Sequence, residues 1–299
     1  MEIAFDFLPF FRIYKDGNIE RLTPSQFVPS SDNPESTVRS KDVVIQTESG
    51  VSARIFMPKV RDPLQKIPLL VYIHGGAFVL GSPANPPFHN FVSSLVEKTN
   101  IMAISVDYRL APENPLPIAF DDSWTAFQWV ISHVSGKGPD PWINEYADFG
   151  RVFLGGESAG ANIAHDVAIR AGEIELGGVV EIVGLFLVHP FFGGKEVDKL
   201  YKILCPASSG CDDDPRLNPA VDPRLRTMAA RRVLFCLAEK DFLRERGMAY
   251  YERLKKSEWI GEVEFMETEG EGHGFHMFNP NSDKAGDLVN RLATFLNHA

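Results

Sequence analysis

Cysteine is scarce in this sequence of 299 residues. The three cysteines, Cys205, Cys211 and Cys236, are an odd number, and their spacing matches neither a disulfide framework nor a metal site. Cys236 lies within an apolar run, which indicates a core position. The sequence therefore predicts a fold held together by its hydrophobic core, with no metal and no cofactor.

Basic residues are also outnumbered by acidic ones, with 30 Lys and Arg against 40 Asp and Glu. The formal net charge is −10, and no Lys/Arg run is present, so a polyanion such as nucleic acid would be repelled. No apolar stretch approaches the ~18 residues of a membrane span. The first residues are apolar but include Glu2 and Asp6 and lack a basic head, which argues against a signal peptide. We therefore expect a cytoplasmic protein that neither binds nucleic acid nor spans a membrane.

Continuous apolar runs, typical of buried parallel strands, recur along the chain. They lie at 68–73, 101–106, 152–154, 183–188 and 233–237, and the segments between them include helical stretches at 91–98, 122–134 and 243–256. A hairpin with its turn at Asp16-Gly17 and alternating strands at 43–45 and 51–56 come earlier. The pattern predicts an α/β fold, with a mostly parallel, doubly wound sheet and helices on both faces. Its length and 44% hydrophobic content suit one domain, 1–299.

The segment Gly156-Glu157-Ser158-Ala159-Gly160 joins one apolar run to a helical pattern. Gly-x-Ser-x-Gly at such a junction is the signature of a nucleophile elbow, a sharp turn that exposes the serine above the sheet. The small neighbours leave room for the strained turn. The following helix directs its free amides and positive end toward the hydroxyl. Ser158 is therefore the predicted nucleophile.

An acid and a base are predicted at the ends of later strands, because ligands of doubly wound sheets bind at the carboxyl ends of the strands. Asp241 follows the run at 233–237, and His273 follows an alternating strand at 262–266. A serine hydroxyl needs an imidazole to take its proton and an acid to orient that imidazole. The order Ser158, Asp241, His273 is also that of α/β-hydrolases.

Two competitors for these roles stay open. Glu239 lies nearer the strand end than Asp241 and ranks second as the acid. His276 comes three residues after His273. The glycines on both sides of His273 favour a tight loop that presents its ring, so His273 ranks first.

A glycine-rich loop, His74-Gly75-Gly76-Ala77, follows the run at 68–73. Without bulky side chains its backbone amides can turn inward and, with the amide of Ala159, form an oxyanion hole. His74 is interpreted as a structural hydrogen-bonding partner. The polar segment 107–113 is interpreted as buried scaffolding under the site.

These motifs together resemble the hormone-sensitive-lipase group of α/β-hydrolases, and within it the plant carboxylesterases related to the gibberellin receptor. The matching segments are 74–78, 107–113, 156–163, 238–241 and 272–275, which span nearly all of the chain. The resemblance implies an α/β-hydrolase fold with an N-terminal lid at 1–36 and a second lid segment at about 191–219. It also implies that Gly76, Ala77 and Ala159 supply the oxyanion amides and that Gly75 supports the turn.

The resemblance implies a carboxylic ester hydrolase that acts through an acyl-enzyme on Ser158. The aromatic residues Phe5, Phe7, Phe10 and Phe11 are enough to line an apolar mouth, so we expect small to medium apolar or aromatic esters. Two relatives of the group suggest alternatives. The gibberellin receptor lacks the catalytic histidine, whereas His273 is present here. Dehydratases and cyclases use the same pocket for elimination or cyclisation, and dehydratases often have threonine at the elbow, where this chain has Ser158. The sequence also departs from the family pattern at Ala77, where a third glycine is usual.

Overall fold

The computed structural model describes residues 2–298 except 61, 63, 195 and 211–212. The strands of the main sheet are β4 (Val38–Gln46), β5 (Val51–Pro58), β6 (Ile67–Ile73), β7 (Met102–Asp107), β8 (Ala147–Glu157), β9 (Ile182–Val188), β10 (Arg232–Ala238) and β11 (Glu262–Thr268). The helices are α1 (Pro86–Thr99), α2 (Ile118–Ile131), α3 (Pro141–Tyr146), α4 (Ala159–Ala171), α5 (Lys199–Leu204), α6 (Arg244–Lys255), α7 (Phe275–Phe278) and α8 (Asp283–Asn297).

The main sheet has eight strands in the order β11-β10-β9-β8-β6-β7-β5-β4. Pairing is parallel from β11 through β7, and only the β7–β5 and β5–β4 pairs are antiparallel. The predicted mostly parallel sheet is therefore confirmed. Since β6, β8, β10 and β11 run in one direction, the segments that follow them meet along one edge of the sheet.

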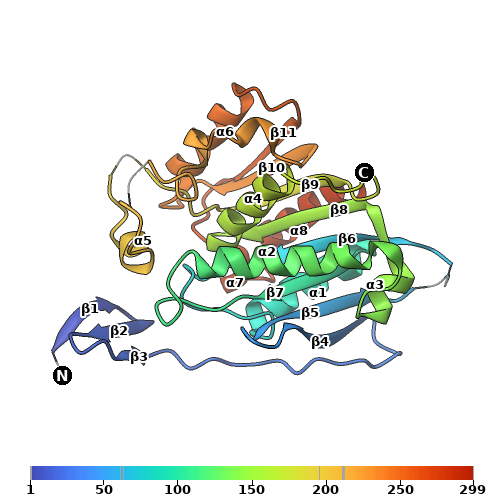
Figure 1. Cartoon of the computed structure of the whole chain (residues 1–299), viewed down its shortest axis with the longest axis horizontal. Coiled ribbons are helices and arrows are strands. Elements are labelled where there is room, and N and C mark those ends of the chain that lie inside the picture. Colours follow the sequence, from blue (N-terminus) through green and yellow to red (C-terminus); the bar gives the residue numbers. More distant parts are fainter. Residues whose placement is uncertain (1, 61, 63, 195, 211–212, 299) are drawn as a thin grey trace.

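Side chains of the central strands alternate between two cores, one on each face of the sheet. In β6, Leu69, Val71 and Ile73 belong to one buried cluster, whereas Leu70 and Tyr72 belong to the other. Helices α2, α4 and α6 cover the first face and α1 and α8 cover the second (Figure 1). Successive side chains of a strand point to opposite faces of the sheet, and helices cover both faces. Every residue of a central strand is therefore buried, which explains the continuous apolar runs in the sequence.

A second, smaller sheet is separate from the main one (Figure 1), and its Phe11 is buried in the first core cluster. Its three antiparallel strands are β1 (Ile3–Phe7), β2 (Phe11–Tyr14) and β3 (Ile19–Arg21). The β2–β3 pair is the predicted hairpin, with Gly17 of its turn at φ 86°. Strand β1 was not predicted, because its apolar residues are interrupted by Asp6, which pairs with Arg12 of β2.

Arg21, the last residue of β3, ties the small sheet to the main body. Its guanidinium donates to the carbonyl of Val79, to the carbonyl of Ala111 at 2.7 Å and to the carboxylate of Glu113. One side chain thus connects the N-terminal sheet with the loop after β6 and the loop after β7.

Several element bounds differ from the predicted ones. Helix α1 begins at Pro86, before the predicted 91–98, because proline suits the first turn of a helix although it interrupts the apolar pattern. Cys236 is buried, as predicted, and so is Cys205, whereas Cys211 lies outside the described residues. Within the described ranges, no helix is both long and apolar enough to cross a membrane.

Candidate active site

Ser158 lies in a strained turn between β8 and α4. Its backbone has φ 54° and ψ −119°, a conformation that costs a non-glycine residue free energy and is typical of functional sites. Close packing enforces the turn: a Cβ added at Gly160 would lie 2.0 Å from the carbonyl oxygen of Ile73. No larger residue fits at Gly160, so α4 begins directly against β6.

Three side chains from distant parts of the chain form a continuous hydrogen-bonded series. Nε2 of His273 lies 2.9 Å from Oγ of Ser158, and Nδ1 lies 2.9 Å from Oδ2 of Asp241. Ser158 and Asp241 are buried, while the His273 side chain is 23% exposed. The structure thus brings together the three residues that the strand-end pattern indicated, each just past the carboxyl end of its strand.

The turn after β10 holds Asp241 in place. Its Oδ1 accepts the amide of Leu243 at 2.8 Å, which leaves Oδ2 for His273. An ionised carboxylate only accepts hydrogen bonds, so Nδ1 of His273 carries the ring proton. Nε2 then presents a lone pair to the hydroxyl of Ser158, which is the tautomer that a general base requires.

Glu239 and His276, the alternatives to Asp241 and His273, take no part in this hydrogen-bonded series. Glu239 accepts the amide of Gly270 at 2.6 Å through Oε2 and does not contact the imidazole of His273. His276 is buried against Phe91 and His189, and both its ring nitrogens lack a partner among the described residues. Burial lowers the pKa of His276 to about 3.

The loop after β6 has positive φ angles at two successive residues, Gly76 and Ala77. Gly76 has φ 107° and Ala77 φ 53°, so Ala77 adopts the left-handed conformation in which a glycine is usual. A Cβ at Gly76 would lie 2.1 Å from the carbonyl of Leu80, which makes glycine necessary there. The amides of Gly76, Ala77 and Ala159 donate to no group within the described part of the chain.

Gly75 differs from the expected oxyanion set. Its amide donates to Oε1 of Glu157 and is therefore not available to a substrate oxygen. This corrects the inclusion of Gly75 among the oxyanion donors and agrees with a supporting place in the turn.

Glu157, within the elbow itself, is a functional candidate that the motif did not single out. The hydroxyl of Tyr72 donates to its other carboxyl oxygen, so Glu157 links β6, the Gly75 loop and the turn at Ser158. Burial raises the pKa of Glu157 well above its ordinary value of 4.5. In Gly-x-Ser-x-Gly the second position is unrestricted, so only the buried surroundings reveal its importance.

We expect Glu157→Gln to gain stability over the wild type as pH rises. Above pH 4.5 an unfolded chain releases the Glu157 proton while the folded chain keeps it, so the wild-type free energy of unfolding falls by up to about 1.4 kcal/mol per pH unit from this group. Glutamine has no such proton. Thermal unfolding at pH 5 and pH 8 measures the effect, with Glu239→Gln as an exposed control. A Tm difference that does not change with pH would contradict the burial argument.

His189, immediately after β9, is a second residue that sequence reasoning missed. It is buried at φ 46°, and its Nδ1 accepts the amide of Gly274 at 3.2 Å, next to His273. A ring nitrogen of His189 and ligand atoms of Asp241 and His273 lie within 4.8 Å of one another. A cation there would compete with the hydrogen bond of His273 to Asp241. The set is therefore better suited to hold the His273 loop than to bind metal.

His74 and the segment 107–113, which the sequence analysis interpreted as structural, make buried stacking, hydrogen-bond and ion-pair contacts. His74 is buried, stacks on Tyr108 with centroids 4.3 Å apart, and has its pKa lowered to about 4 by burial. The hydroxyl of Tyr108 donates to the carbonyl of His74 at 2.9 Å. Arg109 pairs with buried Asp122. These contacts support the floor of the site.

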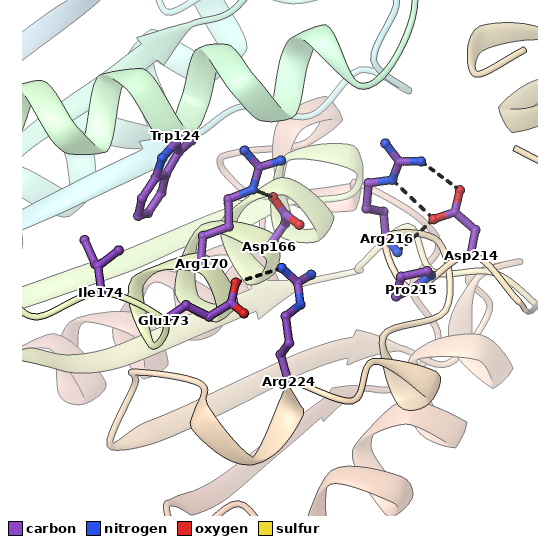
Figure 2. A pocket seen from close by; sticks show the side chains of 9 residues that line it. All are labelled: Trp124, Asp166, Arg170, Glu173, Ile174, Asp214, Pro215, Arg216 and Arg224. Atoms are coloured by element: carbon purple, nitrogen blue, oxygen red, sulfur yellow. Dashed lines mark hydrogen bonds and ion pairs between the residues drawn. The ribbon is translucent and has the colours of Figure 1, made fainter. Parts of the chain in front are cut away.

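A surface cavity of about 510 Å³ lies away from Ser158, between α2, α4 and the segment after α5 (Figure 2). Charged residues line most of it: Asp166, Arg170, Glu173, Asp214, Arg216 and Arg224. Each arginine is paired, Arg170 with Asp166, Arg216 with Asp214 and Arg224 with Glu173. Asp166 is about 12 Å along α4 from Ser158, at 1.5 Å per residue. Of these pairs, Arg224–Glu173 links the segment after α5 to the turn that follows α4, while the other two each lie within one segment.

Comparisons with known proteins agree with this geometry. A family model described as alpha/beta hydrolase fold matches residues 70–277. The chain is 44% identical to probable carboxylesterase 1 of Arabidopsis thaliana, over 99% of this chain and 98% of that protein. It is 39% identical to 2-hydroxyisoflavanone dehydratase of Glycyrrhiza echinata, over 99% and 96%.

Among solved structures, a hyperthermophilic esterase from the archaeon Pyrobaculum calidifontis superposes with a TM-score of 0.68 at 27% identity, with 87% of this chain and 85% of that chain covered. The fold, the strand-end site and the near full-length identities agree with one another. The chain therefore belongs to the α/β-hydrolase fold family, among the plant carboxylesterases of its hormone-sensitive-lipase group.

Proposed function

We propose that this protein is a carboxylesterase that cleaves small to medium apolar or aromatic esters through an acyl-enzyme on Ser158. The observation that carries the proposal is the series of two 2.9 Å hydrogen bonds from Ser158 through His273 to Asp241. Such a series activates an otherwise weak hydroxyl nucleophile. The similarity to probable carboxylesterase 1 supports the same reaction class.

The proposed reaction has two halves. Nε2 of His273 takes the proton of Ser158 as Oγ bonds to the ester carbonyl carbon, and then passes it to the leaving alcohol as the carbon–oxygen bond breaks. Asp241 orients the imidazole and stabilises its positive charge. The amides of Gly76, Ala77 and Ala159 receive the negative charge on the carbonyl oxygen; one such donor is worth about 2.7–4 kcal/mol of barrier height. Water repeats the sequence on the acyl-enzyme and releases the acid.

We also propose that residues 1–36 and about 191–219 act as lid segments within a single domain, 1–299. Phe78, at the end of the oxyanion loop, contacts the second segment through Phe191 and Tyr201, at centroid distances of 5.5 and 6.1 Å. Arg21 brings the first segment to the same loop through the carbonyl of Val79. Both segments thus border the amides that would bind the substrate oxygen.

Elimination of water is the second candidate reaction, and the 39% identity to 2-hydroxyisoflavanone dehydratase favours it over a receptor role. A small-molecule substrate as partner, the lack of a nucleic-acid ligand and a cytoplasmic location stay predictions. Imaging a fluorescent fusion tests the location; one relative, probable carboxylesterase 4 of Arabidopsis thaliana, is named as mitochondrial.

Covalent labelling tests the proposal without the natural substrate. Paraoxon should add one diethylphosphoryl group to Ser158, because the activated hydroxyl displaces p-nitrophenol from phosphorus. Intact-protein mass spectrometry with peptide mapping measures the adduct, and His273→Ala, which keeps the serine but loses its base, should label far more slowly. The absence of an adduct on Ser158 would remove the proposal. A dehydratase could be labelled too, but would lack steady turnover of p-nitrophenyl acetate.

A further inference from the structure

Phe242 presents a large apolar ring to solvent directly beside His273. Its relative exposure is 75%, whereas its neighbours Asp241 and Leu243 are 6% and 2% exposed. The ring centroids of Phe242 and His273 lie 5.1 Å apart, with the planes at 47°. Single exposed apolar residues are ordinary on a protein surface, so what distinguishes Phe242 is the contact of its ring with the imidazole of His273.

The turn that positions Asp241 also fixes the outward direction of Phe242. The amide of Asp241 donates to the carbonyl of Ala238 at 3.1 Å, and the amide of Arg244 donates to the carbonyl of Asp241 at 3.0 Å. The amide of Leu243 donates to the Asp241 carboxylate. With Asp241 and Leu243 held inward, the side chain between them must point out. Its position at the rim is therefore set by the same contacts that place the acid.

The chemistry of ester cleavage assigns a substrate portion to this side of the site. The carbonyl oxygen of the ester goes to the amides of Gly76, Ala77 and Ala159, and the leaving oxygen must come within hydrogen-bonding distance of Nε2 of His273 to receive its proton. The alcohol portion of the ester therefore lies on the imidazole side. Phe242 packs against that imidazole, with the two ring centroids 5.1 Å apart.

We propose that Phe242 is a specificity-determining residue that binds the alcohol portion of the ester and favours aromatic alcohols over short alkyl ones. Aromatic rings attract one another at centroid distances of 4.5–7 Å in offset or tilted arrangements. An aryl or benzyl group attached to the leaving oxygen would form this contact by coming within that range of Phe242. This inference rests on the proposed esterase function and names the substrate class: esters of aromatic alcohols with modest acyl groups.

A pair of isomers tests the assignment. Benzyl acetate has its ring on the alcohol side and methyl phenylacetate has the same ring on the acyl side. For Phe242→Ala we expect kcat/KM to fall about five- to tenfold for benzyl acetate and by no more than about twofold for methyl phenylacetate, the range that one aromatic contact supplies. The change in the ratio of the two kcat/KM values is the readout, since a general loss of active enzyme would leave that ratio unchanged.

Phe278→Ala is the matched control. Phe278 is 86% exposed and lies beside Gly274, but the described ring contacts of His273 are with His189 and Phe242. We expect this variant to keep the wild-type ratio. An unchanged ratio in Phe242→Ala, or an equal shift in Phe278→Ala, would overturn the inference. Paraoxon labelling of Ser158 in the same samples separates the cases, because an unlabelled wild type refutes the esterase proposal itself.

Discussion

Replacement of Ser158 by alanine should abolish ester hydrolysis and leave the fold intact. The variant loses the atom that forms the acyl-enzyme, while the tight approach of Gly160 to Ile73 and the buried bonds of Glu157 remain. Removal of a triad serine lowers kcat by roughly 10³- to 10⁶-fold and leaves a residual rate from binding and the oxyanion hole. Steady-state hydrolysis of p-nitrophenyl acetate measures the loss.

The thermal midpoint of Ser158→Ala provides the folding control. Ser158 has φ 54°, and alanine at this φ has no greater steric cost than serine, so we expect a Tm near that of the wild type. Activity within about tenfold of the wild type, in a preparation free of wild-type enzyme, would be incompatible with a nucleophilic role.

Asp241→Asn should lower kcat by about 10³- to 10⁴-fold, the loss typical of a triad acid replaced by its amide. The amide NH₂ would donate toward Nδ1 of His273, so the ring proton would move to Nε2 and the lone pair facing Ser158 would be lost. The geometry would change little, since asparagine can keep the contact with the amide of Leu243. The measurement is kcat on the same ester as for Ser158→Ala.

Glu239→Gln is the control for the acid. Glu239 accepts the amide of Gly270, and the glutamine oxygen can accept the same hydrogen bond, so the loss should be mild. If Glu239→Gln proved the worse variant, Asp241 would not be the acid that supports His273.

Much of this architecture was predictable from local pattern. The runs at 68–73, 101–106 and 183–188 are buried on both sides of the sheet, and such strands are continuously apolar. Ser158, Asp241 and His273 were predictable because parallel strands bring their carboxyl ends to one edge. Asp241 ranked before Glu239 as the predicted acid, and the hydrogen bond of Asp241 to His273 provides the physical reason for that order.

The supporting residues were not predictable, because their importance depends on contacts between distant segments. Glu157 occupies an unrestricted motif position and matters through Tyr72 and Gly75. His189 ends an ordinary apolar strand, and only the folded chain brings its ring to Gly274. Phe242 would be expected in a core, yet the turn at Asp241 directs it outward. Such long-range contacts leave no periodic signal in the sequence.

Removal of the N-terminal segment would also remove Arg21, whose guanidinium holds the loops after β6 and β7. The small β1–β3 sheet resembles a dispensable appendage, but a version that started beyond residue 21 would leave the carbonyls of Val79 and Ala111 without their cationic donor. Val79 lies two residues after Ala77. Catalytic constants of versions trimmed past residue 21 would then describe a protein in which the loop after β6 has lost this anchor, so kinetic work should use a chain that keeps Arg21.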